Sequence, residues 1–564
     1  MFDVLNTVWE EMVAEGSPFE VVNREIRGVL QRDFKTAPPN LAAFWQATEA
    51  HGERDYLVYE NERITYAQAH QITRSIAQYL HQNGVKQGDR VAIAMRNYPE
   101  YMLIYWAIVS MGASVVGMNA WWVDDEMVYA LNDAKPVFAF MDKERLERFD
   151  RIRSQFPDLQ VVAVRVADAD LGCANSYSEV LTADSIWPEA SLDGDQDACI
   201  FYTSGTTGRP KGAQLTHRSC IANALNMVFM TGVQGEALRR IAGAPPSTPS
   251  PPPVALVATP LFHVTANNCV AYLATLAGGT LVHMYKWDVV EAMRLIEAEK
   301  VTALSAVPVM SREIILHPDF HKYDLSSLTT MGGGGAALQP DLVHKIDKEM
   351  ATAKPNTGYG MTETSGIITS MGAEFFVAKP ASCGRAVPTL EAKCVNEAGE
   401  TSAPGVVGEL WVRGANVIKG YLNRPEATAE SITDGWLHTG DVAYIDEDGC
   451  IFLVDRAKDM VIRGGENVYC AEVENAVFSH DAVAECAVFA VPDERLGEEV
   501  GAAVYVRPGH AVGADELKAH VASQLAPFKV PRHVWFVSDP LPRNANGKFV
   551  KRTLQETLAL ADAQ

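Results

Sequence analysis

The sequence predicts an α/β protein in which a large N-terminal domain, built from parallel or mixed sheets with helices, precedes a small C-terminal α+β domain. Continuous apolar runs alternate with helical periodicity over most of the chain. At 564 residues the chain exceeds what one hydrophobic core supports. Beyond residue 456 about a hundred residues of mixed helices and strands follow, enough for a separate domain. We therefore expect domains at residues 1–456 and 457–564.

The large domain is expected to begin with a helical lead-in over its first forty residues, where charges are mixed and periodicity is weak. Thr65 can cap a helix whose apolar residues recur at i, i+4, i+7 and i+8, namely Ile72, Ile76, Tyr79 and Leu80. Residues 91–95 are a continuous apolar run, typical of a buried parallel strand, and residues 113–118 are expected to form the next strand. A helix that starts at Pro99 connects them and indicates βαβ connectivity.

A proline-rich segment, residues 245–253, interrupts this pattern and is expected to form an exposed, polyproline-like loop. Apolar strands then alternate with helices again, at residues 254–258, 280–284 and 301–307. In the small domain we expect helices at residues 471–478 and 515–525, an apolar stretch at 484–491, and strands at 501–506 and 533–537.

Composition and charge limit the classes of partner. The formal net charge of -23 disfavours nucleic acid or an anionic membrane as the main partner, so anionic ligands have to be met by local basic groups. The nine cysteines contain no C-x-x-C pair, which favours a reducing compartment. The N-terminus lacks a signal-peptide pattern, and residues 102–118 fall short of the roughly 20 apolar residues of a bilayer span. We expect a cytoplasmic protein without stable membrane insertion, whose oligomeric state, a homodimer included, stays open.

The most informative stretch, residues 203–212, reads TSGTTGRPKG and follows the apolar run 198–202. We expect it to form a loop that leaves a buried strand. Its glycines let the backbone approach a ligand, and its hydroxyls and amides donate hydrogen bonds. Lys211 adds a cation, so the loop suits a triphosphate whose leaving pyrophosphate gathers charge. It is not a Walker A loop, because Gly212 rather than Ser or Thr follows the lysine.

Three further motifs carry groups suited to a nucleotide. Residues 331–338 form a second glycine-rich turn, which permits close approach to a flat ring. The run GYGMTE places an aromatic ring between two glycines, where it can stack on a base, and ends in Thr362 and Glu363. Thr362 can bond a phosphate oxygen, and Glu363 can hold Mg²⁺, which prefers oxygen ligands. Asp441 and Arg456 can bond ribose hydroxyls or phosphate.

Together these motifs resemble those of the acyl-adenylate-forming enzymes, which include acyl-CoA synthetases, aryl-CoA ligases, luciferases and adenylation domains. The resemblance extends from about Leu41 to Arg552 and implies an adenylate-forming large domain. It implies an ATP- or AMP-binding site made of Thr203, Ser204, Gly205, Thr206, Thr207, Gly208, Lys211, Gly333, Gly334, Tyr359, Asp441 and Arg456. The catalytic residues that it implies are Lys548, Thr362, Glu363 and His263, with Mg²⁺ held by Glu363 and Thr206.

On the acyl side, the resemblance places His263 at the pocket wall, beside the carboxylate end of the substrate. Relatives that activate amino acids carry an aspartate directly after the aromatic residue, and His263 stands there instead, which speaks against an amino-acid substrate. The other expected lining residues are mostly small or apolar and favour a hydrophobic acid: Val264, Asn267, Val307, Gly333, Gly358, Met361 and Ile367.

Near the C-terminus, the resemblance implies a hinge near Lys458 that withdraws the catalytic lysine after adenylation. The hinge would bring in a loop for CoA that contains Arg463, Gly464 and Gly465. The chain departs from the family pattern at Cys470, where proline is usual, and at Asn544 and Asn546, which replace hydroxyl residues.

The implied function is that of an AMP-forming acyl-CoA synthetase, which uses ATP, Mg²⁺ and CoA to activate a hydrophobic carboxylic acid. A medium- or long-chain fatty acid is the expected substrate. The alternatives are an aryl-CoA ligase for coumarate- or benzoate-like acids, a luciferase-like adenylating oxygenase, and a non-catalytic acyl- or nucleotide-binding protein. Transfer to a carrier protein instead of CoA also stays open.

Overall fold

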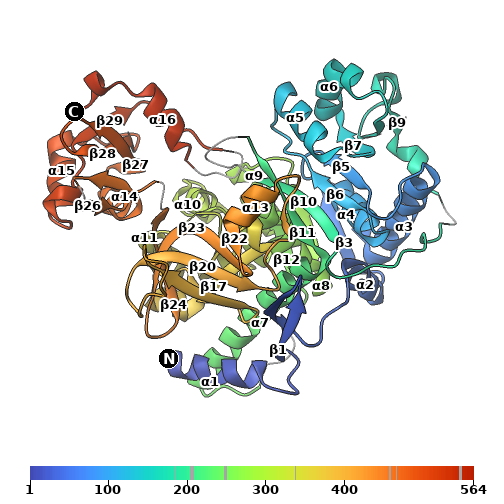
Figure 1. The fold of residues 1–564 in the computed structure, drawn as a ribbon, viewed down its shortest axis with the longest axis horizontal. Helices are drawn as coiled ribbons and strands as arrows, with labels where there is room; N and C mark the ends of the chain where they lie inside the picture. The colour runs from blue at the N-terminus through green and yellow to red at the C-terminus, as the bar shows by residue number, and fades with distance from the viewer. Residues whose placement is uncertain are drawn as a thin grey trace.

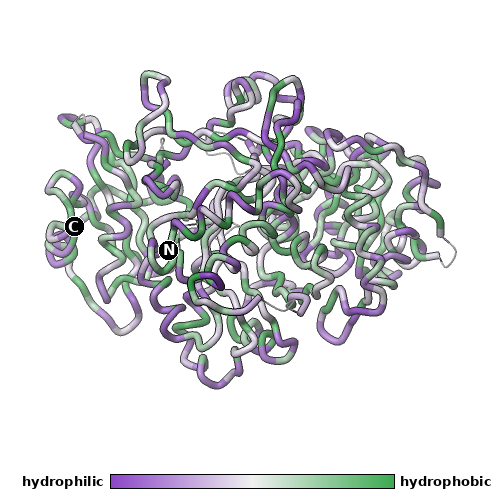
Figure 2. The backbone as a smooth tube through the Cα atoms, turned by 90° about the horizontal axis from the view of Figure 1, so that it is seen from below, coloured by the Kyte–Doolittle hydropathy of each residue, from purple (hydrophilic) through white to green (hydrophobic). Residues whose placement is uncertain are grey.

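The computed structural model describes residues 1–182, 185–203, 209–246, 251–336, 338–456, 459–464, 466–544 and 549–564. The chain folds into a large body and a smaller C-terminal part, drawn in red in Figure 1. Hydrophobic segments concentrate inside both parts, and the periphery is largely hydrophilic (Figure 2). Two large sheets and their helices build the body, and a separate five-stranded sheet builds the C-terminal part, so the predicted α/β fold class is confirmed.

The first sheet has eight strands in the order β21-β11-β10-β6-β5-β7-β8-β9. Their bounds are β5 (Arg90–Ala94), β6 (Ser114–Gly117), β7 (Phe138–Asp142), β8 (Gln160–Val164), β9 (Asn175–Ser176), β10 (Asp197–Thr203), β11 (Lys211–Thr216) and β21 (Gly420–Tyr421). The helices of this region are α2 (Leu41–Ala47), α3 (Tyr66–Gln82), α4 (Pro99–Ser110), α5 (Asp124–Ala134) and α6 (Lys143–Ile152). Thr65 caps α3 as predicted, and Gln68 completes a capping box with it.

Helix α4 explains why residues 102–118 are so apolar. Almost every residue of α4 is buried, because the helix packs against α2, α3 and strands of both sheets. The strand β6 that follows is also buried. In the described part of the chain, no helix is both long and apolar enough to cross a bilayer.

The second sheet has fourteen strands, and its main path runs β19-β20-β23-β24-β18-β17-β16-β15-β14-β12-β13-β3-β4. Neighbours from β3 to β16 pair in parallel, so their carboxyl ends meet at one edge. The strands are β3 (Asp55–Tyr59), β4 (Glu62–Thr65), β12 (Val254–Val257), β13 (Thr280–His283), β14 (Ala303–Ala306), β15 (Thr330–Gly333), β16 (Lys354–Met361), β17 (Gly366–Gly372), β18 (Gly384–Ala386), β19 (Leu390–Val395), β20 (Gly408–Gly414), β22 (Ile432–Thr433), β23 (Trp436–Ile445) and β24 (Cys450–Arg456). Ligands of α/β sheets bind at this kind of edge.

Helices cover both faces of the parallel part of this sheet. One face contacts α9 (Val289–Glu299), α10 (Pro308–Leu316) and α11 (Pro340–Glu349). The long helix α7 (His217–Ile241), a π-helical turn η5 (Thr265–Ala271) and α8 (Tyr272–Leu276) pack near β12, β13 and β17. The body also contains α12 (Ala373–Ala378) and α13 (Pro425–Ser431).

The N-terminal forty residues correct the sequence prediction. Only α1 (Phe2–Val13) is helical there, and β1 (Val21–Ile26) and β2 (Val29–Phe34) then form an antiparallel hairpin. Arg27 and Gly28 make the turn with φ of 51° and 78°, the positive values that a two-residue hairpin turn requires. The strands are short and carry charged residues on the exposed face, so the sequence shows little apolar periodicity.

The C-terminal sheet has the order β26-β25-β28-β27, with β29 beside β28. Its strands are β25 (Val461–Arg463), β26 (Glu466–Val468), β27 (Val483–Asp493), β28 (Gly497–Val506) and β29 (His533–Val537), with helices α14 (Cys470–Phe478), α15 (Ala514–Ala522) and α16 (Lys551–Thr557). The predicted elements of the small domain are confirmed within a few residues, and the domain boundary itself stays a prediction. All nine cysteines of the chain are free thiols.

Candidate active site

A cavity of about 1850 Å³ lies at the carboxyl edge of the parallel strands and extends between the large body and the C-terminal part. Most of the predicted site residues that the structure describes line it: Thr203, Lys211, His263, Val264, Val307, Gly333, Gly334, Gly358, Met361, Thr362, Glu363, Ile367 and Arg456. The structure therefore brings together groups that are as far as 253 residues apart in the chain, from Thr203 to Arg456.

Strands β10 and β11 flank the phosphate loop as an antiparallel pair, in which Thr203 lies opposite Lys211. The Thr203 hydroxyl donates to the carbonyl oxygen of Lys211 over 3.4 Å. This confirms the strand predicted before the loop. The loop residues Ser204, Gly205, Thr206, Thr207 and Gly208 lie outside the described part of the chain.

Tyr421 connects the cation of this hairpin with the predicted metal ligand. The Lys211 ammonium lies 4.6 Å from the centre of the Tyr421 ring. The Tyr421 hydroxyl donates to Glu363 Oε1 over 2.8 Å. Burial and the neighbouring Glu363 carboxylate raise the pKa of Tyr421, so the hydroxyl remains a donor. The sequence analysis missed Tyr421, since a Gly-Tyr pair in a loop carries no motif of its own.

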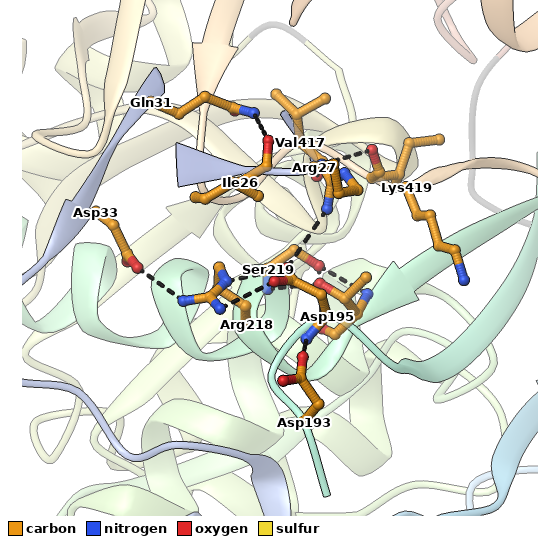
Figure 3. A network of polar contacts seen from close by, with 12 residues as sticks. Ile26, Arg27, Gln31, Asp33, Asp193, Asp195, Arg218, Ser219, Val417 and Lys419 are labelled. Carbon is orange, nitrogen blue, oxygen red and sulfur yellow. Dashed lines mark hydrogen bonds and ion pairs between the residues drawn. The ribbon is translucent and has the colours of Figure 1, made fainter. Parts of the chain in front are cut away.

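The N-terminal hairpin contacts the segment that precedes Tyr421, where Arg27 lies beside Val417 (Figure 3). The Arg27 guanidinium donates to the carbonyl oxygens of Val417 and Ile418, at 3.1 and 3.3 Å. The Ile418 N–H donates in turn to the Glu363 carbonyl oxygen over 3.0 Å. The hairpin is itself anchored to α7, because Arg218 of that helix pairs with Asp33 of β2 at 3.1 Å. Glu363 is thus fixed through both its backbone and its side chain.

Tyr359, Asp441 and Arg456 form a second constellation. The Tyr359 hydroxyl donates to Asp441 Oδ2 over 2.5 Å, and Arg456 Nε lies 3.1 Å from Asp441 Oδ1. Asp441 and Arg456 face each other across β23 and β24. Burial, and then the Asp441 charge, raise the pKa of Tyr359. Of the three, Arg456 reaches the cavity, whereas Tyr359 and Asp441 are not among the described residues that line it.

His263 and Thr362 both line the cavity. The Thr265 N–H donates to His263 Nδ1 over 3.3 Å, so the neutral ring carries its proton on Nε2. Thr362 is 6% exposed and begins a short helical turn that also contains Glu363. Asn267 is fully buried and its amide donates to Asn268 Oδ1 over 2.8 Å; it is not among the described residues of the cavity wall.

In the small domain, Arg463 is engaged in an ion pair. Its Nε and Nη2 atoms donate to the two carboxylate oxygens of Glu499, at 2.7 and 2.8 Å. Gly464 makes the turn after β25 with φ of 61°, and its N–H donates to the Leu496 carbonyl oxygen over 2.8 Å. Lys458, Gly465 and Lys548 lie outside the described residues. Asn544 and Phe549, on either side of the undescribed residues 545–548, line the cavity.

The junction between the two parts of the chain is built around Asp455. Its carboxylate accepts the Arg456 N–H over 2.7 Å and also the N–H of Cys470, a donor that the usual proline lacks. Burial raises the pKa of Asp455 to about 6, while the nearby Lys551 charge opposes this shift and Glu474 adds to it. Lys551 itself is paired with Glu474 at 2.8 Å. The departure at Cys470 thus adds a contact at this junction.

Comparison with known proteins decides the family. The family model for AMP-binding enzymes matches residues 44–422, and the model for the C-terminal domain of AMP-binding enzymes matches residues 472–548. This chain belongs to the AMP-binding enzyme family. The predicted superfamily and enzyme class, an AMP-forming carboxylic acid–CoA ligase, are confirmed, with ATP, CoA and Mg²⁺ as its cofactors.

Individual relatives of the ligase cover nearly the whole chain. It is 36% identical over 491 residues to a feruloyl-CoA synthase from Amycolatopsis sp, with 86% of this chain and 92% of the relative covered. It is 31% identical to a long-chain-fatty-acid–CoA ligase from Bacillus subtilis, with 89% and 92% covered. Among solved structures, o-succinylbenzoate CoA synthetase from Bacillus subtilis bound to its acyl-adenylate superposes with a TM-score of 0.77 at 28% identity, covering 92% of this chain and 98% of that one.

The geometry around Glu363 fits Mg²⁺, the metal cofactor of the family. Mg²⁺ is commonly held by one or two carboxylates together with substrate phosphates, rather than by a protein cage. In the described part of the chain, no cluster of three or more His, Cys, Asp or Glu residues could hold a metal on its own. Glu363, which lines the cavity near Lys211, supplies the kind of single carboxylate that a phosphate-bridged Mg²⁺ requires.

Proposed function

We propose that this ligase activates a hydrophobic carboxylic acid, a medium- or long-chain fatty acid, as acyl-AMP and then transfers the acyl group to CoA. The supporting observation is that one cavity joins the polar groups Lys211, Thr362 and Glu363 to a long apolar wall. A substrate that bridges these surfaces has its carboxylate at the nucleotide and its apolar part against the wall.

In the first step, a carboxylate oxygen of the acid bonds to the α-phosphorus of ATP, and the bond to pyrophosphate breaks. Lys211 stabilises the negative charge that gathers on the leaving pyrophosphate. Thr362 donates to an α-phosphate oxygen, and Glu363 holds Mg²⁺, which neutralises phosphate charge when bound. Asp441 and Arg456 bind the ribose, and His263 borders the substrate carboxylate.

In the second step, the CoA sulfur, after loss of its proton, bonds to the acyl carbon, and the bond to AMP breaks. We place Lys548 beside the carboxylate in the first step, where its charge lowers the repulsion between two anions. Asn544 and Phe549 support this placement because they line the same cavity. Rotation near Lys458 then removes Lys548 and presents the loop at Arg463–Gly465 to CoA.

Separate assays of the two half-reactions distinguish the proposed role of Lys548 in adenylation from a purely structural role. The Lys548→Ala variant is expected to lose acyl-adenylate formation. The same variant should still convert supplied acyl-AMP to acyl-CoA. Lys348→Ala, a change at a side chain that is 83% exposed, serves as the control. Equal loss of both half-reactions in Lys548→Ala would contradict the two-step assignment.

An aryl acid is the second candidate substrate, and the relatives favour it. The chain is 36% identical to a feruloyl-CoA synthase and 31% identical to a 4-coumarate–CoA ligase from Petroselinum crispum. The small residues Gly333 and Gly358 in the cavity wall leave room for a flat ring.

Pyrophosphate release from ATP and Mg²⁺ tests the function across straight-chain, aryl and polycyclic acids, with and without CoA. We expect release that depends on both an acid and CoA, and we expect Glu363→Gln to remove it while Glu397→Gln, at an exposed glutamate, keeps it. Release that ignores CoA would refute CoA as the acceptor. Oxygen uptake with acid and ATP would instead identify the oxygenase alternative.

A further inference from the structure

The cavity continues beyond the predicted acyl pocket, along the strands to their amino ends. Paired residues of neighbouring strands mark its successive levels. Ser305 and Asn356 line it at one level, where both strands flank Gly332 of β15. Ala255, Ala303 and Thr330 line it at the next level. Beyond them, the cavity is lined by residues that precede the strands, namely Pro253, Thr302 and Thr329.

Small side chains give this part of the cavity its width. Alternate residues of a strand point to opposite faces of a sheet. On β14, Ala303 and Ser305 line the cavity, while the larger Leu304 between them packs into the core on the other face. On β12, Ala255 lines the cavity and Leu256 packs into that same core. The face that borders the cavity thus carries the smaller residue at each of these positions.

The opposite wall is one face of two helical segments. Met227, Val228, Thr231 and Gly232 of α7 line the cavity at i, i+1, i+4 and i+5. Cys269, Val270, Leu273, Ala274 and Ala277 of η5, α8 and the residue that follows repeat this spacing and extend it to i+8. Such spacing keeps all these residues on one side of a helix. The wall is mostly apolar along its whole length.

The length of this wall sets the length of the ligand. From Val307, which directly follows β14, to Ala303 the cavity follows a rise of four residue steps, which corresponds to about 13 Å of strand. An extended chain places three backbone atoms in roughly 3.5 Å, so an alkyl chain of about eleven carbons spans this distance. At the far end, Ala277, Thr329 and Pro251 are exposed, so the cavity reaches the surface of the described structure there.

We propose that this distal part of the cavity is a tail subsite, which binds the end of an extended apolar acid of about ten carbons or more. Ala277 borders the outer end of this subsite. The proposal rests on the proposed function and names the shape of its substrate. The subsite also assigns a role to Pro251 and Pro253 of the proline-rich segment, because they border the far end of the acyl chain.

The test compares straight-chain saturated acids from hexanoate to hexadecanoate, each below its micelle concentration, with ferulate as a short aryl acid. The readout is kcat/KM for CoA-dependent pyrophosphate release. Each buried methylene is expected to raise kcat/KM by about fourfold until the subsite is filled. Ala277→Trp is expected to lower kcat/KM for hexadecanoate by about tenfold or more, and to leave hexanoate and ferulate within about twofold.

Two further variants keep the result interpretable. Thr329→Trp narrows the same end from an exposed position and should reproduce the loss for hexadecanoate. Ala398→Trp, at an exposed alanine outside the cavity wall, should change no acid. A chain-length profile that is flat beyond hexanoate in the unmodified enzyme, or an equal loss for all acids in Ala277→Trp and Thr329→Trp, would overturn the tail subsite. Absence of release with every acid would instead refute the proposed function.

Discussion

Tyr421 offers a direct test of how the site positions the carboxylate of Glu363, the proposed metal ligand. Tyr421→Phe removes the hydroxyl that donates to Glu363 Oε1 over 2.8 Å, and it keeps the ring that lies 4.6 Å from the Lys211 ammonium. A hydrogen bond to a charged group contributes about 1.5–3 kcal/mol. If this contribution acts on the transition state, the rate of adenylation falls by about tenfold to 150-fold. The main effect is expected on Mg²⁺, because Glu363 loses the partner that fixes its orientation.

The assay is acid-dependent pyrophosphate release as a function of Mg²⁺ concentration. We expect Tyr421→Phe to lower kcat and to raise the Mg²⁺ concentration at half-saturation. Tyr421→Leu also removes the ring that lies near the Lys211 ammonium. Its rate of adenylation is expected to fall below that of Tyr421→Phe by a factor that corresponds to about 0.5–2 kcal/mol, the range of a cation–π contact.

Tyr444→Phe is the matched control. Tyr444 stacks on Phe452 with ring centres 4.8 Å apart and is not among the residues of the cavity wall. A Tyr421→Phe enzyme with the rate and Mg²⁺ dependence of the Tyr444→Phe control would refute the positioning role. A Tyr421→Leu enzyme that is no slower than Tyr421→Phe would show that the ring contact with Lys211 does not contribute to the first step.

Three other changes have defined outcomes. Asp441→Asn removes the charge of a side chain that both Tyr359 and Arg456 contact, but it keeps the shape of that side chain. The KM for ATP should therefore rise by about tenfold or more, while the KM for the acid stays unchanged. An unaltered KM for ATP would contradict the proposed binding of the ribose by Asp441. Arg27→Ala should lower kcat by about fivefold or more without changing the KM for the acid, because the two hydrogen bonds to the segment before Tyr421 are lost. Arg27→Lys should restore part of the rate. A variant that changes only the melting temperature would indicate a purely structural role for Arg27. Because burial raises the pKa of Asp455 from 3.8 to about 6, the folded state binds more protons than the unfolded state between these pH values, and the Asp455 contribution to stability falls as pH rises through this range. The melting temperature of Asp455→Asn should lack this part of the pH dependence. If the melting temperatures of the variant and the unmodified protein changed in parallel with pH, the contribution of Asp455 would be contradicted.

Local chemistry explains why the elements that carry the proposed site residues could be predicted. The loop at Thr203–Lys211 and the turn at Thr362–Glu363 are defined by consecutive residues, and a strand or turn beside them follows from short apolar runs. The capping box at Thr65 is likewise local, since its partner Gln68 is three residues away. Such features depend little on the rest of the fold.

The contacts that sequence reasoning missed depend on distant parts of the chain. Tyr421 reaches Glu363 across 58 residues, and Arg27 reaches Val417 across 390. No periodicity in either segment indicates the other. The tail subsite also required the structure, because it depends on which face of β14 meets α7 and η5. Asn267 shows the same limit, since Thr265 and Cys269, two residues away on either side, line the cavity while Asn267 itself is buried.

The products formed from ATP, CoA and hexadecanoate test the central claim most directly. Mass spectrometry of a reaction with Mg²⁺ should detect AMP and palmitoyl-CoA in equal amounts, together with pyrophosphate, and neither product should form without the acid. Formation of ADP and phosphate, or of AMP without any acyl-CoA across the whole range of acids, would contradict an AMP-forming ligase that transfers an apolar acyl group to CoA.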